Sequence, residues 1–567
     1  MRGATCLVVA THLCACETEP GAGPGTEVPR ENSPGFAFEN EIRCESGVLG
    51  MDRLQDEAIA RGLDLDQDPE PVPGFMHRDP MGGGVVLTDL DGDTDIDVVL
   101  GDYPWFPAIY ANDGTGSFTR CDVQPPELPQ GAREIGFFGA ADFTGDGLPE
   151  LVLHGAAFTM VSENLGGMTF GPPEFVHRTE QGEPRGLIQT GAYGDVDGDG
   201  DLDMLLPVVH QGGSGQDGGG PGSGGEGDGN TPVPEPGFDM LYINEGDDGW
   251  RRSHLLSPEG EPGHAQVAVM TDFDLDGDLD LLVPSEFGDR SEKTALYRND
   301  GLDADGDVIL VNVAPELTAD IDPGAMGIDS FDANGDGRLD YCVSSVGPPQ
   351  CLMSLGEEGF VEGATAFGLT VPQSFDRAEW SSYSIDFADL DNDGFTDAAV
   401  SAGPPNRDDP NPLHPDALYK GTAEGTLVEV TESVGFGDER RHYALASADL
   451  DRDGHLDMLV SGTEGQPVLW MNTCGPDAWL TLDFVGPGLN AEAYGVIVSL
   501  RAEGRTQMRE LYNLRAIGQG PSELHFGLGD VDVAEELHVH WPDGVTSSYY
   551  DVPLRRRVTV THPSRLE

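Results

Sequence analysis

A nine-residue acidic loop, placed between two apolar segments, recurs seven times in this chain of 567 residues. Successive loops start 53 to 60 residues apart, apart from one interval of 77 that falls to 50 when the 27 residues 211–237 are left out. A fixed period of this length is the signature of a repeat architecture. We interpret the Gly-rich residues 211–237 as a disordered insert. The loops begin at Asp89, Asp142, Asp195, Asp272, Asp332, Asp389 and Asp449.

Each repeat has a second half that is also built from short apolar segments with turn signals. Residues 109–114 read IYANDG, residues 241–246 read LYINEG and residues 296–301 read LYRNDG. About four short strands in a repeat of roughly fifty residues are typical of a propeller blade. The sequence therefore predicts an all-β fold, with a seven-bladed β-propeller over residues 36–473. Residues 474–567 are predicted to form a small β domain, with strands at 479–484, 496–501, 536–540 and 558–561 and a turn at 541–544.

The chemistry of the loops is clearest in the third one, residues 195–203, which reads DVDGDGDLD. Carboxylates at loop positions 1, 3, 5 and 9, with a backbone carbonyl at position 7, can converge on one hard cation. Oxygen-only ligands in this number suit Ca²⁺ better than Mg²⁺. An EF-hand needs Glu at loop position 12, whereas that position is Leu or Val in all seven loops. Seven copies in register also argue against plain solvated turns.

The sequence thus predicts up to seven Ca²⁺ ions, one for each loop. The second loop has one carboxylate fewer and is predicted to bind most weakly or not at all. The first loop has Thr94 where the other loops have Gly, which predicts a strained turn. The predicted ligands are Asp89, Asp91, Asp93, Asp95 and Asp97; Asp142, Thr144, Asp146 and Glu150; Asp195, Asp197, Asp199, Asp201 and Asp203; Asp272, Asp274, Asp276, Asp278 and Asp280; Asp332, Asn334, Asp336 and Asp340; Asp389, Asp391, Asp393 and Asp397; and Asp449, Asp451, Asp453 and Asp457.

The charge of the chain is strongly one-signed, with 102 acidic and 30 basic residues and a formal net charge of −72. This charge excludes nucleic acid and an anionic membrane face as partners through direct attraction. Adaptation to salt would give the same composition. Without cations the clustered carboxylates repel one another, so we expect calcium to contribute to folding itself.

The first residues resemble a bacterial lipoprotein signal. In residues 1–16, Met1 and Arg2 precede a short apolar run at residues 6–10 and then the sequence LCAC at residues 13–16, and the Glu-, Pro- and Gly-rich residues 17–35 follow as a flexible linker. We predict a lipid anchor at Cys16 and a location at the cell surface or outside the cell. A plain secretory signal or an ordinary disordered start are the alternatives.

The remaining cysteines suit an oxidising compartment. Cys342 and Cys351 flank a Gly-Pro-Pro stretch that we interpret as a hairpin connection, which favours a local disulfide. Cys44 could pair with Cys121 or with Cys474.

No catalytic motif is present: the sequence has no HExxH, no GxSxG and no GxxxxGK[ST]. A carboxylate on calcium cannot also serve as a general acid. We therefore predict no catalytic residue, and favour a binding or adhesion module for an extracellular glycan or protein. A polysaccharide hydrolase or lyase with its site in the propeller funnel is the alternative, and a structural scaffold is a third.

The loops and their flanking strands resemble the FG-GAP/VCBS repeats of integrin α-subunit propellers, over about residues 81–473. The C-terminal part resembles the ASPIC/UnbV domain of the cartilage acidic protein family, through residues 490–496 (NAEAYGV), 525–529 (HFGLG) and 539–544 (VHWPDG), with departures at Tyr494 and Val496. The resemblance implies calcium between the first two strands of each blade and a ligand on the opposite face. It also implies that an N-terminal segment, here residues 36–42, completes the last blade, with Cys44 bridged to Cys474 across the seam.

Overall fold

The computed structural model describes residues 34–42, 54–65, 84–101, 107–123, 135–155, 158–179, 186–210, 238–246, 249–256, 265–285, 293–373, 375, 380–404, 414–437, 440–462, 466–473, 475–513 and 517–566. The helices that lie wholly within these ranges are the short turns α1 (Ala364–Phe367), α2 (Thr431–Val434) and two 3-10 turns, Gly356–Glu358 and Pro563–Leu566. None of them is long and apolar enough to cross a membrane. The predicted all-β class is confirmed. The proposed anchor Cys16, the insert 211–237 and the cysteines Cys44 and Cys474 lie outside the described residues.

Six sheets follow one another along the chain, each with four antiparallel propeller strands, and the first of them also has a fifth strand from the C-terminal region. They comprise β3 (Val85–Thr88), β4 (Asp97–Leu100), β5 (Ala108–Asn112) and β6 (Phe118–Arg120); β7 (Ile135–Ala141), β8 (Glu150–Gly155), β9 (Phe158–Ser162) and β10 (Glu174–Arg178); β12 (Ala192–Gly194), β13 (Asp203–Leu206), β15 (Asp239–Asn244) and β16 (Trp250–Leu256); β17 (Val269–Thr271), β18 (Asp280–Val283), β19 (Ala295–Leu302) and β20 (Val308–Asn312); β21 (Ala325–Phe331), β22 (Asp340–Ser345), β23 (Gln350–Ser354) and β24 (Phe360–Glu362); and β25 (Ser382–Ala388), β26 (Asp397–Ala402), β27 (Ala417–Gly421) and β28 (Leu427–Glu429). Strands β11 (Gly186–Ile188) and β14 (Val208–His210), which flank β12 and β13 in the sequence, form a separate two-stranded sheet.

The last sheet closes the ring with a strand from the N-terminal region. Strands β29 (His442–Ala448), β30 (Asp457–Gly462) and β31 (Val468–Met471) are completed by β2 (Gln55–Asp56), which pairs with β31. The prediction that residues 36–42 complete this sheet is wrong. Those residues include β1 (Phe36–Phe38), which pairs instead with β39 (Arg556–Thr561) near the C-terminus. Because β1 pairs with β39, the ring is closed by the short strand β2 instead.

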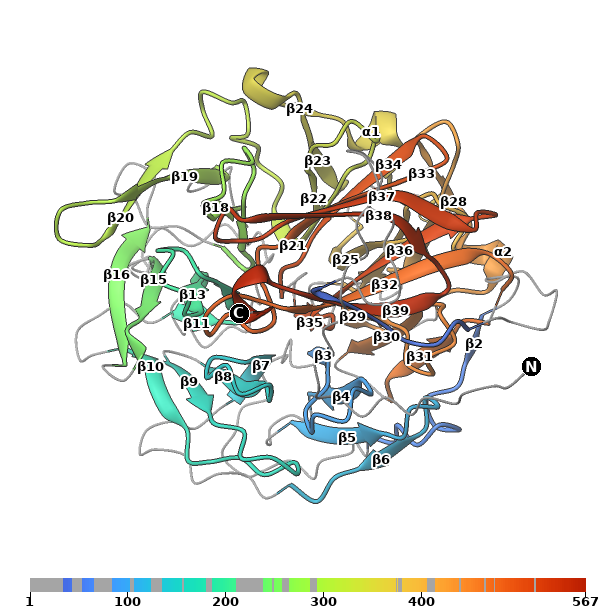
Figure 1. The fold of residues 1–567 in the computed structure, drawn as a ribbon, viewed down its shortest axis with the longest axis horizontal. Helices are drawn as coiled ribbons and strands as arrows, with labels where there is room; N and C mark the ends of the chain where they lie inside the picture. The colour runs from blue at the N-terminus through green and yellow to red at the C-terminus, as the bar shows by residue number, and fades with distance from the viewer. Residues whose placement is uncertain are drawn as a thin grey trace, which may run out of the picture.

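Figure 1 shows the sheets in chain order around a ring, which is the arrangement of a β-propeller. Buried side chains of neighbouring sheets pack into shared clusters, and one such cluster joins the first sheet to the last. Asparagine side chains add hydrogen bonds between sheets. Asn112 Nδ2 donates to the Leu450 carbonyl at 2.8 Å, and Asn299 Nδ2 donates to the Val196 carbonyl at 2.9 Å. Each of these bonds ties the third strand of one sheet to the acidic loop of the preceding sheet.

The C-terminal residues form two further sheets. One has the order β1-β39-β32-β36, with β32 (Ala478–Val485) and β36 (Glu523–Gly529). The other has the order β34-β33-β37-β38, with β34 (Arg505–Glu510), β33 (Ile497–Ala502), β37 (Val533–His540) and β38 (Thr546–Pro553). Strands β32, β33, β37 and β39 confirm the four predicted strands. The predicted turn at 541–544 is also present, because the Gly544 N–H donates to the Trp541 carbonyl at 3.0 Å.

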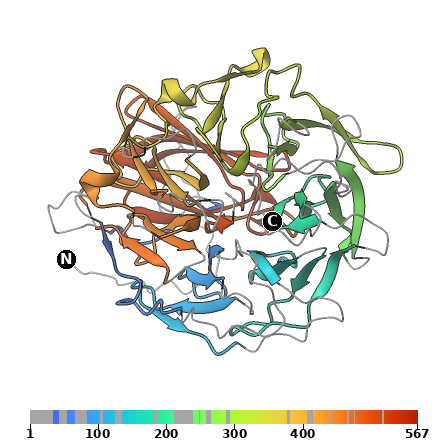
Figure 2. The ribbon, with the colours of Figure 1, turned by 180° about the vertical axis from the view of Figure 1, so that it is seen from behind.

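This C-terminal domain, which we call the cap, sits on one face of the ring. Its strands lie on the viewer's side of the ring in Figure 1 and behind the ring in Figure 2. Phe143 and Tyr193 of the propeller share a buried cluster with Tyr494 and Trp541 of the cap. The cap and the propeller are thus joined by a common core.

Residues 511–513 and 517–519 of the cap enter the centre of the ring. Strand β35 (Gly518–Gln519) pairs with β3 in parallel, and Gln519 exchanges hydrogen bonds with the Ala140 backbone of β7 at 3.0 and 2.6 Å. Asn513 does the same with Gly191 and Tyr193. Ile517 packs against a cluster of Met326, Tyr383 and Tyr443 from three other innermost strands. The cap therefore plugs the central channel from this face.

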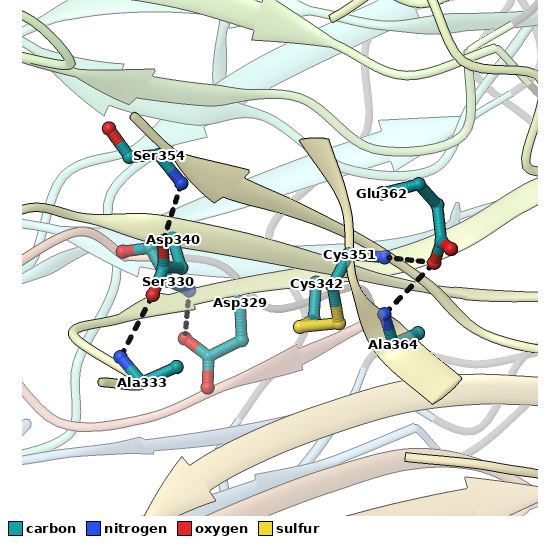
Figure 3. The surroundings of a disulfide bond; sticks show 9 residues. All are labelled: Asp329, Ser330, Ala333, Asp340, Cys342, Cys351, Ser354, Glu362 and Ala364. Atoms are coloured by element: carbon teal, nitrogen blue, oxygen red, sulfur yellow. Dashed lines mark hydrogen bonds between the residues drawn. A yellow bond between two sulfur atoms is a disulfide. The ribbon is translucent and has the colours of Figure 1, made fainter. Parts of the chain in front are cut away.

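The predicted disulfide between Cys342 and Cys351 is confirmed. The two residues lie directly opposite each other on β22 and β23, and Figure 3 shows the bond between these strands. Cys121 carries a free thiol, which rules out its pairing with Cys44.

Candidate metal centres

All seven acidic loops join the first strand of a propeller sheet to the second, as the resemblance implied. In each loop, position 9 is the first residue of the second strand: Asp97 begins β4 and Asp203 begins β13. Because the inner strands run in the same direction, the loops gather on one face of the ring. This is the face on which the cap sits.

The acid at position 1 stabilises the conformation of its own loop. Its carboxylate accepts the backbone N–H of position 6 in every loop, with distances from 2.7 Å at Asp389 to 3.0 Å at Asp449. The residue at position 6 has a positive φ where the turn requires it, and Thr94 in the first loop has φ 76°. Thr94 therefore adopts the conformation that favours glycine, as predicted.

The acid at position 9 is fully buried and joins the loop to the third strand of its sheet. One oxygen of Asp340 accepts the Ala333 N–H at 3.0 Å and the other accepts the Ser354 N–H at 2.6 Å (Figure 3). Asp97, Asp203, Asp280, Asp397 and Asp457 make the equivalent pair of bonds. Position 9 thus has a structural role that the sequence pattern did not reveal.

Predicted ligand residues converge in at least five of the loops, where one oxygen from each of three acids lies within 4.8 Å of the others. In the third and fourth loops the acids come from positions 1, 3 and 5. In the first and sixth loops they come from positions 1, 3 and 9, and in the second from positions 1, 5 and 9. The groups are Asp89, Asp91 and Asp97; Asp142, Asp146 and Glu150; Asp195, Asp197 and Asp199; Asp272, Asp274 and Asp276; and Asp389, Asp391 and Asp397.

Some of these oxygens are buried without a hydrogen-bond partner in the described structure, which fits a hard cation as the missing partner. They are Asp91 Oδ1, Glu150 Oε1, Asp389 Oδ1, Asp391 Oδ1 and Asp451 Oδ1. Burial, together with the charge of neighbouring acids, raises the pKa of Asp195 to about 7, of Glu150 to about 8 and of Asp280 to about 9. A divalent cation in each loop would offset both costs. The donor set therefore fits Ca²⁺.

The side chain at loop position 7 has different partners in different loops. Asp95 forms an ion pair with Arg452 of the seventh loop, at 2.9 Å between Asp95 Oδ1 and Arg452 Nη1. The prediction that the side chain at position 7 binds the cation thus has the least support in the first loop, where Asp95 pairs with Arg452.

The cap contacts the loops directly, and this feature was missed by reasoning from the sequence. Glu492 Oε2 accepts the Asp142 N–H at 2.7 Å, and the Gly200 carbonyl accepts the Leu489 N–H at 2.7 Å. The sixth and seventh loops are the most enclosed. Gly394 and Gly454, at position 6 of these loops, are buried, whereas the equivalent residues of the other five loops are exposed or half-buried.

Two family models match the chain. Residues 486–567 match the family described as ASPIC and UnbV, and residues 89–153 match the FG-GAP-like repeat. Cartilage acidic protein 1 of Xenopus tropicalis is 28% identical over 185 residues, which are 31% of this chain and 25% of that protein. The match thus spans about a quarter of the length of this relative. The resemblance predicted from the loop and C-terminal motifs is confirmed.

Solved structures resemble the chain only loosely. A lectin of Agrocybe aegerita, described as specific for non-reducing terminal N-acetylglucosamine, has a TM-score of 0.39 and 16% identity, and the match covers 63% of this chain and 80% of the lectin. The protein BBS1N, solved in complex with ARL6DN, has a TM-score of 0.37 and 12% identity, with 72% of this chain and 97% of that chain covered. These values are too low to bear on function.

Proposed function

We propose that this protein is an exported, calcium-loaded β-propeller that binds an extracellular glycan or protein and does not catalyse a reaction. The observation that carries the calcium part is the convergence of carboxylate oxygens in the loops, some of them buried without a hydrogen-bond partner. Ca²⁺ would supply the positive charge that these carboxylates lack, and their oxygens would coordinate it. Extracellular modules of this kind bind calcium at about 10⁻⁴ to 10⁻³ M, which supports a location outside the cytoplasm.

The position of the cap supports a ligand site on the opposite face of the ring. The described residues of the cap contact the second, third, fourth, sixth and seventh loops and enter the channel at residues 511–513 and 517–519. A large ligand therefore has no free approach to the channel from the loop side. The same plug removes, on this side, the open funnel that a polysaccharide hydrolase or lyase would need.

The calcium part is tested by counting bound ions during titration with the full chain. Several ions per chain are expected, and none would contradict the proposal. The predicted weakness of the second loop is tested by a matched pair at loop position 5, Asp146→Ala in the second loop and Asp199→Ala in the third. The second substitution is expected to remove a bound ion, and the first is expected to change the titration little. Equal effects would contradict the ranking.

The ligand part is tested by a binding screen against soluble glycans in calcium buffer, with product analysis on each glycan that binds. Binding without cleavage is expected. Release of shortened products would instead favour the hydrolase or lyase.

A further inference from the structure

Lysine is rare in this chain, and one of its two lysines lies in a predicted metal loop. The chain contains only Lys293 and Lys420. Lys420 is on β27, and its ammonium contacts two acids of the sixth loop. The distance between Lys420 Nζ and Asp393 Oδ2 is 3.1 Å, and Nζ also contacts Asp391 Oδ2 directly. These acids stand at loop positions 5 and 3, so the ammonium bridges two of the predicted ligand residues.

The register of the sheets shows that this lysine is particular to the sixth loop. Lys420 directly follows Tyr419, which pairs with the residue at loop position 10. The same strand position is occupied by Met353 in the fifth sheet, Met471 in the seventh and Arg298 in the fourth. Arg298 is basic, but its guanidinium pairs with Asp300 at 2.7 Å rather than with a loop acid. The equivalent positions in the fifth and seventh sheets thus suggest methionine as the replacement for Lys420. Arg298 in the fourth sheet provides a matched control.

Basic side chains also approach other loops in the described structure, but each contacts a single loop acid. Arg338 Nη1 lies 3.3 Å from Asp336 Oδ2, and Arg452 Nη1 lies 2.9 Å from Asp95 Oδ1. Arg61 Nη2 lies 3.9 Å from Asp451 Oδ2. The ammonium of Lys420 differs from these guanidinium groups because it contacts the acids at positions 3 and 5 of one loop together.

The sixth loop nevertheless keeps oxygens for a metal. Lys420 takes the Oδ2 atoms of Asp391 and Asp393, whereas Asp389 Oδ1 and Asp391 Oδ1 are buried without a hydrogen-bond partner. Asp389 is fully buried, and its carboxylate lies within 4.8 Å of those of Asp391 and Asp397. The geometry thus leaves room for a cation beside the ammonium.

We propose that Lys420 is a built-in counter-ion of the sixth loop, which lowers the calcium affinity of that loop and keeps it folded when calcium is absent. This inference rests on the calcium binding proposed above. A positive charge held within a few ångströms of a divalent ion opposes its binding. The same charge offsets the mutual repulsion of the four loop acids. The sixth loop therefore fills after the loops that lack such a lysine.

The sixth loop is also a docking point for the cap. The Asn392 carbonyl accepts the Gly529 N–H at 2.7 Å, the Asn392 side chain contacts His525 Nε2 at 2.8 Å, and the Gly394 carbonyl accepts a hydrogen bond from Arg505 at 3.0 Å. A loop that Lys420 keeps folded without calcium would hold the cap on the ring at low calcium concentrations. Lys420 thus links the cap to the propeller independently of metal.

The test compares the wild-type chain with Lys420→Met, which places at this position the residue found in the fifth and seventh sheets, and with the control Arg298→Met. Bound calcium is counted by equilibrium dialysis over a range of free calcium concentrations, and thermal unfolding is followed in EDTA. In Lys420→Met one site is expected to bind at least tenfold more tightly, and the melting temperature in EDTA is expected to fall. Arg298→Met is expected to change both quantities far less, because Arg298 pairs with Asp300 and acts on the loop acid Asp274 only from a distance. Lys420→Gln, which keeps a polar side chain, gives the same comparison if the methionine variant does not fold.

The two proposals fail in different ways. If the wild-type chain binds calcium and the Lys420 variants bind it with the same affinities, the role of Lys420 is overturned and calcium binding stands. If neither the wild-type chain nor the variants bind calcium, both proposals are overturned.

Discussion

Glu510 of the cap accepts a hydrogen bond from the backbone N–H of Asp272, the first acid of the fourth loop, with 3.0 Å between Asp272 N and Glu510 Oε1. The other oxygen of Glu510 accepts the Thr271 hydroxyl at 2.6 Å. Glu492 makes the equivalent contact with Asp142 in the second loop. Two buried carboxylates of the cap therefore fix the points at which two acidic loops begin.

These contacts predict that Glu510→Ala destabilises the chain. The substitution leaves the Asp272 N–H without its acceptor and removes one of the two partners of the Thr271 hydroxyl, which also bonds to the Tyr341 hydroxyl. The expected cost is about 1 to 3 kcal/mol in the free energy of unfolding. Glu510→Gln keeps an acceptor oxygen and removes a carboxyl whose pKa burial raises to about 8, so it is expected to cost less. Urea unfolding of the three proteins measures the difference. Equal stabilities of the Ala variant and the wild-type chain would show that the contact does not hold the cap.

A second prediction concerns the close packing of the cap on the seventh loop. A Cβ at Gly454 would lie 1.9 Å from the Trp479 ring, whereas a Cβ at Gly147, the same position of the second loop, would meet nothing within 4 Å. Both glycines have similar positive φ values, 89° and 87°. Backbone strain is thus matched, and Gly454→Ala is expected to lower the melting temperature clearly more than Gly147→Ala. A similar loss for both variants would contradict the docking of Trp479 on this loop.

The third prediction is a pH dependence outside the metal loops. Burial raises the pKa of Asp239 to about 7, although its carboxylate accepts the Val208 N–H at 2.7 Å. A raised carboxyl pKa means that the folded chain holds the proton more tightly than the unfolded chain does. Below about pH 4 the carboxyl is protonated in both states, so Asp239 does not lower the free energy of unfolding. As the pH rises from about 4 to about 7, Asp239 lowers the free energy of unfolding progressively.

Asp239→Asn removes this cost and keeps an acceptor for Val208. The variant is expected to be more stable than the wild-type chain at pH 8, on the order of 3 kcal/mol, and equally stable near pH 4. Unfolding free energies measured across this range in constant calcium provide the check, with the exposed Asp305→Asn as the control. A constant difference between variant and wild type at all pH values would refute the assignment.

The fourth prediction concerns the disulfide of the fifth sheet. Cys342 and Cys351 are separated by nine positions in the sequence, and closing a loop of that size stabilises a fold by about 2.5 kcal/mol through the unfolded chain. The double variant Cys342→Ala and Cys351→Ala is expected to lose about this much stability. Reduction of the wild-type chain is expected to give the same loss in chemical unfolding, and no loss in either experiment would contradict the prediction.

The sequence predicted the propeller well because its information is local and repeated. Each loop with its flanking strands, such as β12 and β13, is specified within one repeat, and the four C-terminal strands follow from alternation in short segments. The pairing of the termini was not predictable in this way. Residues 36–42 and residues 54–56 are both short segments before the first full sheet, and only the structure shows that β1 pairs with β39 while β2 pairs with β31.

The site was predicted in part. Acids such as Asp195 and Asp197 converge as their spacing indicated, because the loop geometry is fixed by the nine residues themselves. The contribution of the cap depends on contacts between residues hundreds of positions apart, such as Glu510 with Asp272 and Gln519 with Ala140. No periodicity records such contacts, and the position of Lys420 beside Asp391 likewise depends on strand register.

Thermal unfolding of the full chain in millimolar calcium and in EDTA tests the central claim, that the acidic loops hold divalent ions on which the ring depends. Each site is expected to contribute about 2.7 kcal/mol at a hundredfold excess of calcium over its dissociation constant. With several sites the melting temperature should therefore fall by on the order of 10 °C or more in EDTA, and calcium, added back in excess of EDTA, should restore it. A chain that contains no bound metal and melts at the same temperature in both buffers would contradict the claim.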